Sequence, residues 1–248
     1  MNDDVYGIKK WGNDILEILE NGNIGLKNPF HPDNSPADLI KIIKSLNERG
    51  ISCPVLLRVT DYLAFRIKQI NNSFFRAIRE IRYKGEYKGV FPVKVNQQAQ
   101  VIDRIVEFGK EFDFGLEVGS KPELLIALAH DLSANSTIIC NGIKDREFIH
   151  LAILSIKIGF KTILVLESPR ELDLIIKISK ELNVRPLLGI RVKLTNKVSG
   201  NWSQSSGDRS AFGLSVEQVM EVINKLKIYD YLDCLIYNIH TLEVRYQI

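Results

Sequence analysis

From residue 89 onward, short apolar runs alternate with amphipathic stretches, and this alternation constrains the fold more than any other feature of the sequence. The runs are nearly continuously apolar, as expected of parallel strands that are buried on both faces. Strands and helices in regular alternation are typical of parallel β–α units. The predicted strands span residues 89–95, 112–118, 137–141, 162–167, 187–194 and 233–239. The helical patterns between them span residues 99–108, 122–129, 145–158, 169–182 and 215–226.

Two architectures are built from such units, a doubly wound open sheet and a closed (β/α)8 barrel. No GxGxxG motif follows the first strand and the sequence has no P-loop, which disfavours a nucleotide-binding open sheet. We therefore predict an α/β fold in which residues 89–248 form a partial (β/α)8 barrel of about six of the eight units. Residues 1–88 are predicted to form an N-terminal extension with a long leading helix, for which Asp61 is the candidate N-cap.

Composition and charge exclude several classes of partner. The net charge is only +3 and the basic residues are interleaved with acidic ones, which is not the pattern of a nucleic-acid-binding surface. Cys53, Cys140 and Cys234 lie far apart in apolar runs, as expected of reduced thiols in a cytosolic protein without a zinc site. The polar N-terminus is unlike a signal peptide, and no apolar run reaches the roughly 20 residues of a membrane helix. We expect a cytoplasmic protein that binds neither nucleic acid nor membrane.

Polar residues follow the predicted strands at their C-terminal ends. Active sites of (β/α)8 barrels lie at this end of the strands, so these side chains are expected to meet at one barrel mouth. Such a mixture of cationic, anionic and amide groups suits a small anionic ligand or cofactor. The residues concerned are Lys94, Glu117, Asn141, Glu167, Arg191 and His240.

Each of these residues also has a purely structural interpretation. Lys94, between Val93 and Val95, is either a partly buried nucleophilic amine or a solvated lysine, and the strand alone favours the latter. Glu117 follows a buried run, where a carboxylate needs a cation or a cofactor as partner. Arg191 is either an anion ligand or half of an ion pair, and a lone histidine such as His240 is more often a core residue. The insertion at residues 195–211 is either a lid or a surface loop.

Long segments of the chain resemble one family of enzymes. The segments GVFPVKVNQQAQVIDRIVEFG, FDFGLEVGSKPELLIALA, IICNGIKDREFIHLA and SGNWSQSSGDRSAFGLS are similar to the biosynthetic arginine decarboxylases, from about Trp11 to His240 and in the same order. That family depends on pyridoxal 5′-phosphate (PLP) and has an alanine-racemase-like barrel. The resemblance implies that L-arginine is decarboxylated to agmatine, a precursor for polyamine and spermidine biosynthesis. It also implies a magnesium requirement and a homo-oligomer, although the sequence shows no magnesium site.

The same resemblance implies roles for individual residues. Lys94 is similar to the lysine that holds PLP covalently, and Glu117 to the acidic residue beside that linkage. Glu123 matches the glutamate of the SKxEL turn. Arg191 resembles an arginine that orients the cofactor, and His240 a histidine that stacks on the pyridine ring.

After His240 the sequence departs from the family, in which Gly-Ser-Gln follows within a few residues. Codons compatible with residues 240–248 can be read in a neighbouring frame as His-Phe-Gly-Ser-Gln. Our hypothesis is a frameshift near residues 236–240. Two further strands, the phosphate-binding loop and the C-terminal β-domain of the family would then be absent, leaving sheet edges open.

Two other interpretations remain at the level of sequence. The chain could be a non-catalytic relative that binds a partner or PLP, although it ends within a strand-end motif and not at a capped element. It could also be a related decarboxylase acting on ornithine or lysine, but the upstream region and the SGNWSQSSGDRS segment favour arginine.

The frameshift hypothesis predicts that the isolated chain folds poorly, binds PLP weakly and lacks decarboxylase activity. Accurate resequencing, from the codons of the last predicted helix to beyond that of Ile248, tests it directly. A restored frame would make the chain part of a full arginine decarboxylase. A soluble, yellow and active preparation of the chain itself would contradict the prediction of inactivity.

Overall fold

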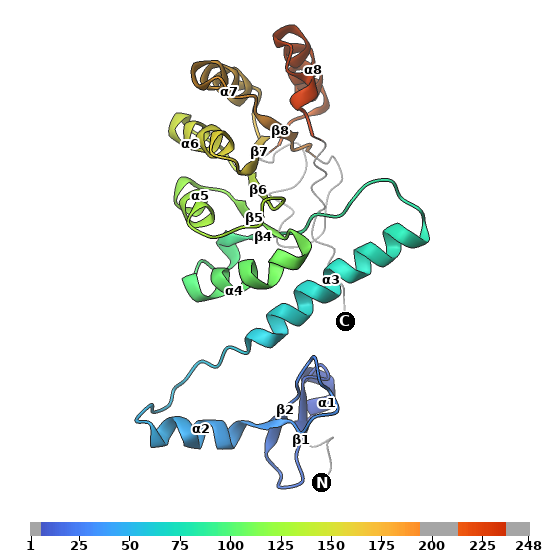
Figure 1. Cartoon of the computed structure of the whole chain (residues 1–248), viewed down its shortest axis with the longest axis vertical. Coiled ribbons are helices and arrows are strands. Elements are labelled where there is room, and N and C mark those ends of the chain that lie inside the picture. Colours follow the sequence, from blue (N-terminus) through green and yellow to red (C-terminus); the bar gives the residue numbers. More distant parts are fainter. Residues whose placement is uncertain (1–5, 194–212, 237–248) are drawn as a thin grey trace. The chain divides into compact units, whose positions relative to one another are not determined.

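The computed structural model describes residues 6–193 and 213–236, and Figure 1 traces the elements along the chain. The chain divides into two compact units between Glu80 and Ile81. The boundary expected from the sequence, at residue 88, falls in the segment of the second unit that leads into its first strand. Each unit is described by itself.

The first unit contains a small antiparallel sheet and three helices. Strands β1 (Leu16–Ile18), β2 (Ile24–Leu26) and β3 (Ala37–Asp38) pair in chain order, and the helices are α1 (Ile8–Trp11), α2 (Leu39–Glu48) and α3 (Thr60–Glu80). Asp38 is the N-cap of α2, where its carboxylate accepts from the backbone N–H groups of Ile40 and Lys41. Amide donation from Asn23, and further bonds from Asn21 and the helix backbone, hold the pKa of Asp38 at about 2 despite partial burial.

The long helix α3 confirms the leading helix but not its expected cap. Asp61 lies in the first turn, because the helix already begins at Thr60. A carboxylate in this position still interacts favourably with the helix dipole. The Asp61 side chain is therefore compatible with the start of the helix without being its N-cap.

The second unit is a parallel sheet flanked by helices, as the alternating sequence predicts. Strands β4 (Val90–Pro92), β5 (Gly115–Val118), β6 (Thr137–Cys140), β7 (Lys161–Leu166) and β8 (Leu187–Ile190) are hydrogen-bonded in strict chain order. All neighbouring pairs are parallel. Strands that pair in chain order, each followed by a helix, form the wall of a (β/α)8 barrel. The predicted α/β class is confirmed.

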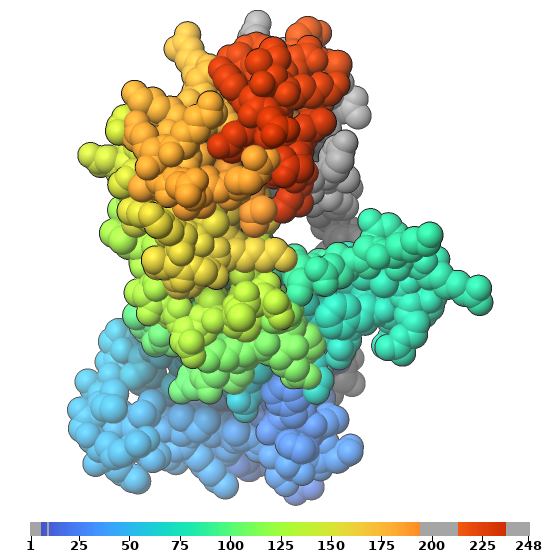
Figure 2. Space-filling model, turned by 45° about the horizontal axis from the view of Figure 1, so that its top comes forward, coloured from blue at the N-terminus to red at the C-terminus, as the bar shows by residue number. Residues whose placement is uncertain are grey.

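The predicted helices of this unit are all present. They are α4 (Ala99–Gly109), α5 (Lys121–Leu128), α6 (Arg146–Lys157), α7 (Pro169–Leu182) and α8 (Val216–Tyr229). Figure 1 shows α5, α6 and α7 on the same side of the sheet, and Figure 2 shows α7 and α8 packed side by side in orange and red. Side-chain caps begin four of them, from Ser120, Asp145, Ser168 and Ser215.

Three predicted strands are shorter than expected. The first ends at Pro92, and Val93–Val95 form a 3-10 turn, η1. The second begins only at Gly115, because the 3-10 turn η2 (Lys110–Phe112) and the left-handed Asp113 precede it. The run from residue 187 leaves the sheet after Ile190.

The sixth predicted strand, residues 233–239, is not a strand over its described part. Residues Leu232–Cys234 form a 3-10 turn, η3, and only an isolated parallel bridge joins Leu235 to Leu188. Residues 237–239 lie outside the described part of the chain. Over its described residues, 233–236, the run is joined to β8 by this bridge and by the Ile236 N–H, which donates to the Leu188 carbonyl.

The core lies between the sheet and its helices. In the ladder, Leu116 faces Ile138 and Leu164 faces Leu188, and all four side chains are fully buried. The helices contribute fully buried side chains that include Leu124, Ile149, Ile153, Leu172 and Ile175. Burial of apolar surface at about 25 cal/mol per Å² makes this layer the main stabilising contact of the unit.

The core predicts different effects for two isoleucines at opposite ends of α6. Ile149→Ala should lower the free energy of unfolding by about 2–5 kcal/mol, because the fully buried side chain would leave a cavity. Ile158→Ala is the control, since Ile158 is 71% exposed, and should change it by no more than about 0.5 kcal/mol. Urea unfolding measures both, and equal losses would contradict the assigned core.

Candidate active site

The C-terminal ends of the five parallel strands lie at one edge of the sheet, and charged side chains gather there. Lys94 is in the turn after β4, Glu117 is in β5, and Glu167 follows β7 directly. Asn141 and Arg191 directly follow β6 and β8. The structure thus brings five of the six expected strand-end residues to one edge, and the sixth, His240, lies outside the described residues.

Lys94 does not lie on the predicted strand, and its exposure agrees with the solvated lysine that the strand alone favours. Its side chain is 64% exposed, and its Nζ lies 3.9 Å from Oε1 of Glu117. Val93 is buried whereas Val95 is 68% exposed, so the two valines do not share a face. The 3-10 turn is the reason, because its residues are spaced by about one third of a turn and do not alternate. The amine projects from the strand ends beside a carboxylate.

Glu117 is the buried partner in this pair. The residue is 7% exposed, and the side-chain amide of Asn141 donates to its Oε1 over 3.1 Å. The Oδ1 atom of Asn141 is itself buried and has no hydrogen-bond partner among the described residues. Such an acceptor is costly to leave unpaired, which indicates that a ligand or water donates to it.

Glu123 has a local role at the start of α5. Its Oε2 accepts from the backbone N–H of Gly119 over 2.8 Å, while Ser120 accepts from the backbone N–H of Glu123. The pair resembles a capping box, in which the glutamate would accept from the backbone N–H of the N-cap residue Ser120. Here it accepts instead from the residue before the N-cap, Gly119. The contact fixes the turn that follows Glu117 and thereby the path of the chain from β5 to α5.

Arg191 forms an ion pair with Glu167. Its Nη1 lies 3.2 Å from Oε1 of Glu167, whose side chain is fully buried. The backbone N–H of Gly142 donates to the same oxygen over 2.9 Å. The strand ends of β6, β7 and β8 are therefore tied together at the carboxylate of Glu167.

The sequence analysis missed two buried charged residues beneath this edge, Lys144 and Glu171. The Lys144 side chain has no exposed surface, and its Nζ lies 3.2 Å from Oε2 of Glu171. Both residues belong to β–α loops or helix starts, where charged residues are normally solvated, so their sequence context indicates no burial. The one sequence feature that could have indicated their burial is that each residue closely follows the end of an apolar strand.

Cys140, at the end of β6, has a buried thiol. Desolvation raises the pKa of Cys140 to about 12, with smaller opposing effects from Lys144, which lowers it, and Glu117, which raises it. The thiol therefore stays protonated at neutral pH, where it is a poor nucleophile. It belongs to the core under the site and not to its chemistry.

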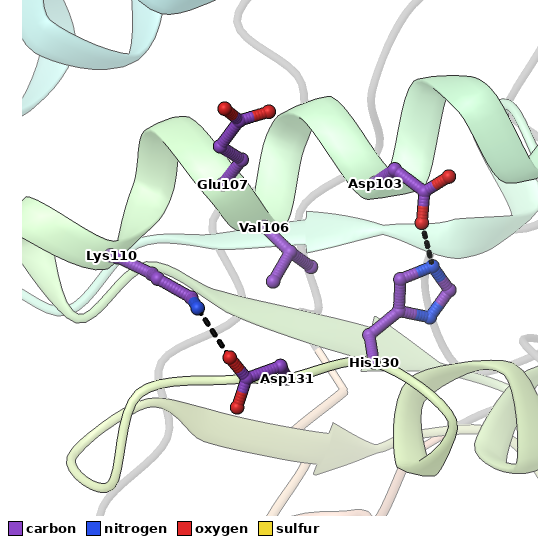
Figure 3. A pocket seen from close by; sticks show the side chains of 6 residues that line it. All are labelled: Asp103, Val106, Glu107, Lys110, His130 and Asp131. Carbon is purple, nitrogen blue, oxygen red and sulfur yellow. Dashed lines mark hydrogen bonds and ion pairs between the residues drawn. The ribbon is translucent and has the colours of Figure 1, made fainter.

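A separate hollow lies between α4 and the segment after α5 (Figure 3). Glu107 lines it and pairs with Arg104, and two further ion pairs hold its other charged groups. His130 Nε2 lies 3.0 Å from Asp103, and Lys110 Nζ lies 2.5 Å from Asp131. Because most of these side chains are exposed, the hollow has the character of a surface feature.

Some residues expected at the site lie outside the described part of the chain, and the described part offers no group of metal ligands. His240 and most of the insertion at residues 195–211 are outside the described ranges. Within residues 6–193 and 213–236, no cluster of three or more His, Cys, Asp or Glu side chains is arranged to hold a metal ion. No helix in the described ranges is both long and apolar enough to span a membrane.

Comparison with known proteins identifies relatives across most of the chain. The family described as "Pyridoxal-dependent decarboxylase, pyridoxal binding domain" matches residues 67–240. The biosynthetic arginine decarboxylase of Gloeobacter violaceus is 45% identical over 232 residues, which are 94% of this chain and 36% of the relative. That of Prochlorococcus marinus (strain MIT 9312) is 47% identical over 222 residues, covering 90% of this chain and 34% of the relative.

Solved structures show the same likeness. The crystal structure of the biosynthetic arginine decarboxylase of Campylobacter jejuni has a TM-score of 0.82 and 33% identity, covering 97% of this chain and 37% of that one. A diaminopimelate decarboxylase from M. jannaschii, with a TM-score of 0.62 and 20% identity, shares the fold. The predicted partial barrel is confirmed by these matches. The chain spans about a third of the length of the curated relatives it matches.

The contact between Asn141 and Glu117 generates a test of the site. In Asn141→Asp, a second carboxylate would face Glu117 across about 3 Å, so we expect a loss of about 1–3 kcal/mol in the free energy of unfolding at pH 7. The loss should shrink towards pH 5, because adjacent carboxylates cannot both remain ionised and one takes up a proton. Urea unfolding at both values of pH measures the change.

The control is Asn141→Asp combined with Glu117→Gln, which restores an amide opposite a carboxylate in reversed order. We expect most of the lost stability to return. A double variant no more stable than the single one would show that the two side chains do not interact as described.

Proposed function

Because this chain belongs to the pyridoxal-dependent decarboxylases, we propose that it is the cofactor-binding part of an arginine decarboxylase. The reaction proposed for the whole enzyme is decarboxylation of L-arginine to agmatine and carbon dioxide. Agmatine would feed polyamine biosynthesis, including that of spermidine. We propose a cytoplasmic location and a homo-oligomeric enzyme on the same grounds.

The observation that carries the proposal is the pairing of Lys94 with Glu117 at the strand ends. An exposed lysine amine lies 3.9 Å from a buried carboxylate, on the edge where barrel enzymes bind their ligands. Lysine amines form covalent linkages with carbonyl groups, and PLP carries an aldehyde. The arrangement supplies the nucleophile that this cofactor needs.

Other residues at this edge also fit PLP. Arg191 contributes a cation to an edge that would receive an anionic cofactor, and the unpaired Oδ1 of Asn141 offers an acceptor to a polar ligand. When bound, PLP supplies an electron sink for the negative charge left by loss of a carboxylate. The protein supplies binding, orientation and control of protons.

We assign roles to the site residues on this basis. Lys94 would hold the cofactor through its amine, and Glu117 would keep a negative charge beside that amine. Glu123 would brace the turn that positions Glu117, and Arg191 would orient the cofactor. His240 is proposed, from the resemblance, to stack on the pyridine ring.

Substrate and domain assignments belong to the same proposal. Identities of 45% and 47% to arginine decarboxylases, against 20% to a diaminopimelate decarboxylase, favour arginine as the substrate. Residues 1–88 would form the N-terminal extension and residues 89–248 the PLP-binding barrel segment. The resemblance also implies magnesium, to which we assign no residue, because the described part of the chain offers no ligand cluster.

The proposal predicts that Lys94 forms the covalent link to PLP. Incubation of the chain with PLP, reduction with borohydride and peptide mass mapping should locate the label on Lys94. Lys94→Ala should lose this label, because no other amine lies beside Glu117 among the described ion pairs. Lys110→Ala is the control, since Lys110 pairs with Asp131 in the hollow between α4 and the segment after α5.

The same variants test the reaction in a chimera that joins this chain to the remaining segment of the Gloeobacter relative. We expect carbon dioxide release from L-arginine in preference to L-ornithine and L-lysine, and its loss with Lys94→Ala but not with Lys110→Ala. Labelling that is spread over surface lysines, or a chimera whose activity survives Lys94→Ala, would overturn the proposal.

A further inference from the structure

Lys144 is a lysine with no exposed side-chain surface, in the loop between β6 and α6. Its Nζ donates to two backbone carbonyls, that of Gly142 over 2.6 Å and that of Val165 over 2.5 Å. The carboxylate of Glu171 is its third partner, at 3.2 Å. All three donors of the ammonium group are therefore directed to acceptors on β7, the start of α7 and its own loop.

Glu171 links this lysine to the end of β7. One of its oxygens accepts from the backbone N–H of Lys144, and the other from the backbone N–H of Glu167, each over 2.9 Å. The carboxylate thus joins the loop after β6 to the residue that ends β7. A single charged pair determines the path of the backbone at both places.

Glu167 connects the Lys144–Glu171 pair to Arg191. Its backbone is held by Glu171, and its side chain accepts from the backbone N–H of Gly142, whose carbonyl is held by Lys144. The same carboxylate pairs with Arg191. A closed set of contacts therefore runs from Lys144 through Glu171 and Glu167 to Arg191.

Stability alone does not explain this arrangement. Transfer of a lysine and a glutamate into the interior carries a desolvation cost that their attraction often fails to exceed, and apolar residues of the same volume would serve a core as well. A fully hydrogen-bonded charged pair does, however, fix the geometry of its neighbours.

We propose that Lys144 is a positioning residue, which holds Glu167 through Glu171 and thereby sets the Arg191 guanidinium at the cofactor edge. The inference rests on the proposed function for its significance, because Arg191 is there assigned to orient PLP. The contacts among the four residues stand independently of that assignment.

Lys144→Met tests the proposal, since methionine keeps the unbranched apolar part of the side chain and removes the ammonium group. We expect amide hydrogen exchange of Gly142 and Glu167 to become at least about tenfold faster, in line with the loss of charge-assisted hydrogen bonds. The amide of Ile153, in the middle of α6, should keep its protection, which separates a local change from global destabilisation. Lys161→Met, at the opposite end of β7, is the matched control and should leave all three amides unchanged.

A second readout uses PLP and the circular dichroism that it acquires when bound. Per mole of bound PLP, Lys144→Met should alter this signal, and the affinity should fall by about tenfold, while Lys161→Met behaves as the unsubstituted chain. Glu171→Gln provides the same test if Lys144→Met fails to fold, because it leaves Lys144 bonded to both carbonyls. The change in dichroism reports orientation, which a purely stabilising residue would not affect.

The outcomes separate the inference from the proposed function. If neither the chain nor its chimera with the Gloeobacter segment binds PLP, the proposed function fails, and the exchange of Gly142 and Glu167 still decides the role of Lys144. If the chain binds PLP but neither the exchange nor the dichroism differs between Lys144→Met and Lys161→Met, Lys144 does not position Arg191. Uniformly faster exchange that includes Ile153 would assign Lys144 to stability alone and overturn the inference.

Discussion

Parallel pairing of five consecutive strands is the constraint on which the rest of this structure depends. Because every strand runs in the same direction, all five C-terminal ends lie at one edge. The ladder is held within the core by pairs of buried side chains, such as Leu164 against Leu188. Residues far apart in sequence, from Lys94 to Arg191, are thereby brought to one place.

Charge at this edge is arranged in two different environments. Lys94 is exposed and pairs with a buried Glu117, so that its amine is accessible while its charge partner is fixed. The carboxylate of Glu167, which is fully buried, pairs with Arg191. Lys144 and Glu171 form a second pair, in which both side chains are buried. The first arrangement suits chemistry at the amine, whereas the second suits a rigid support. A covalent cofactor requires both an accessible nucleophile and a scaffold that does not move.

Family membership and local geometry support the site in different ways. The match over residues 67–240 shows that the chain belongs to the pyridoxal-dependent decarboxylase family, but it does not describe how the groups contact one another. The contacts show that Glu123 braces a turn and that Arg191 belongs to an ion pair. They also identify Asn141, to which the resemblance assigns no role and whose buried Oδ1 has no hydrogen-bond partner among the described residues.

The α/β class and the strand ends at which polar residues gather can be predicted from the sequence alone. These follow from hydrophobic periodicity, which is a local property that the chain carries in its order of residues. The folded structure shows that Lys94 lies in a 3-10 turn after Pro92 and not on the predicted strand, although its exposure agrees with the solvated lysine that the sequence favoured. Only the tertiary structure placed Lys144 and Glu171 in the interior, since a charged residue is buried only where partners from other segments surround it.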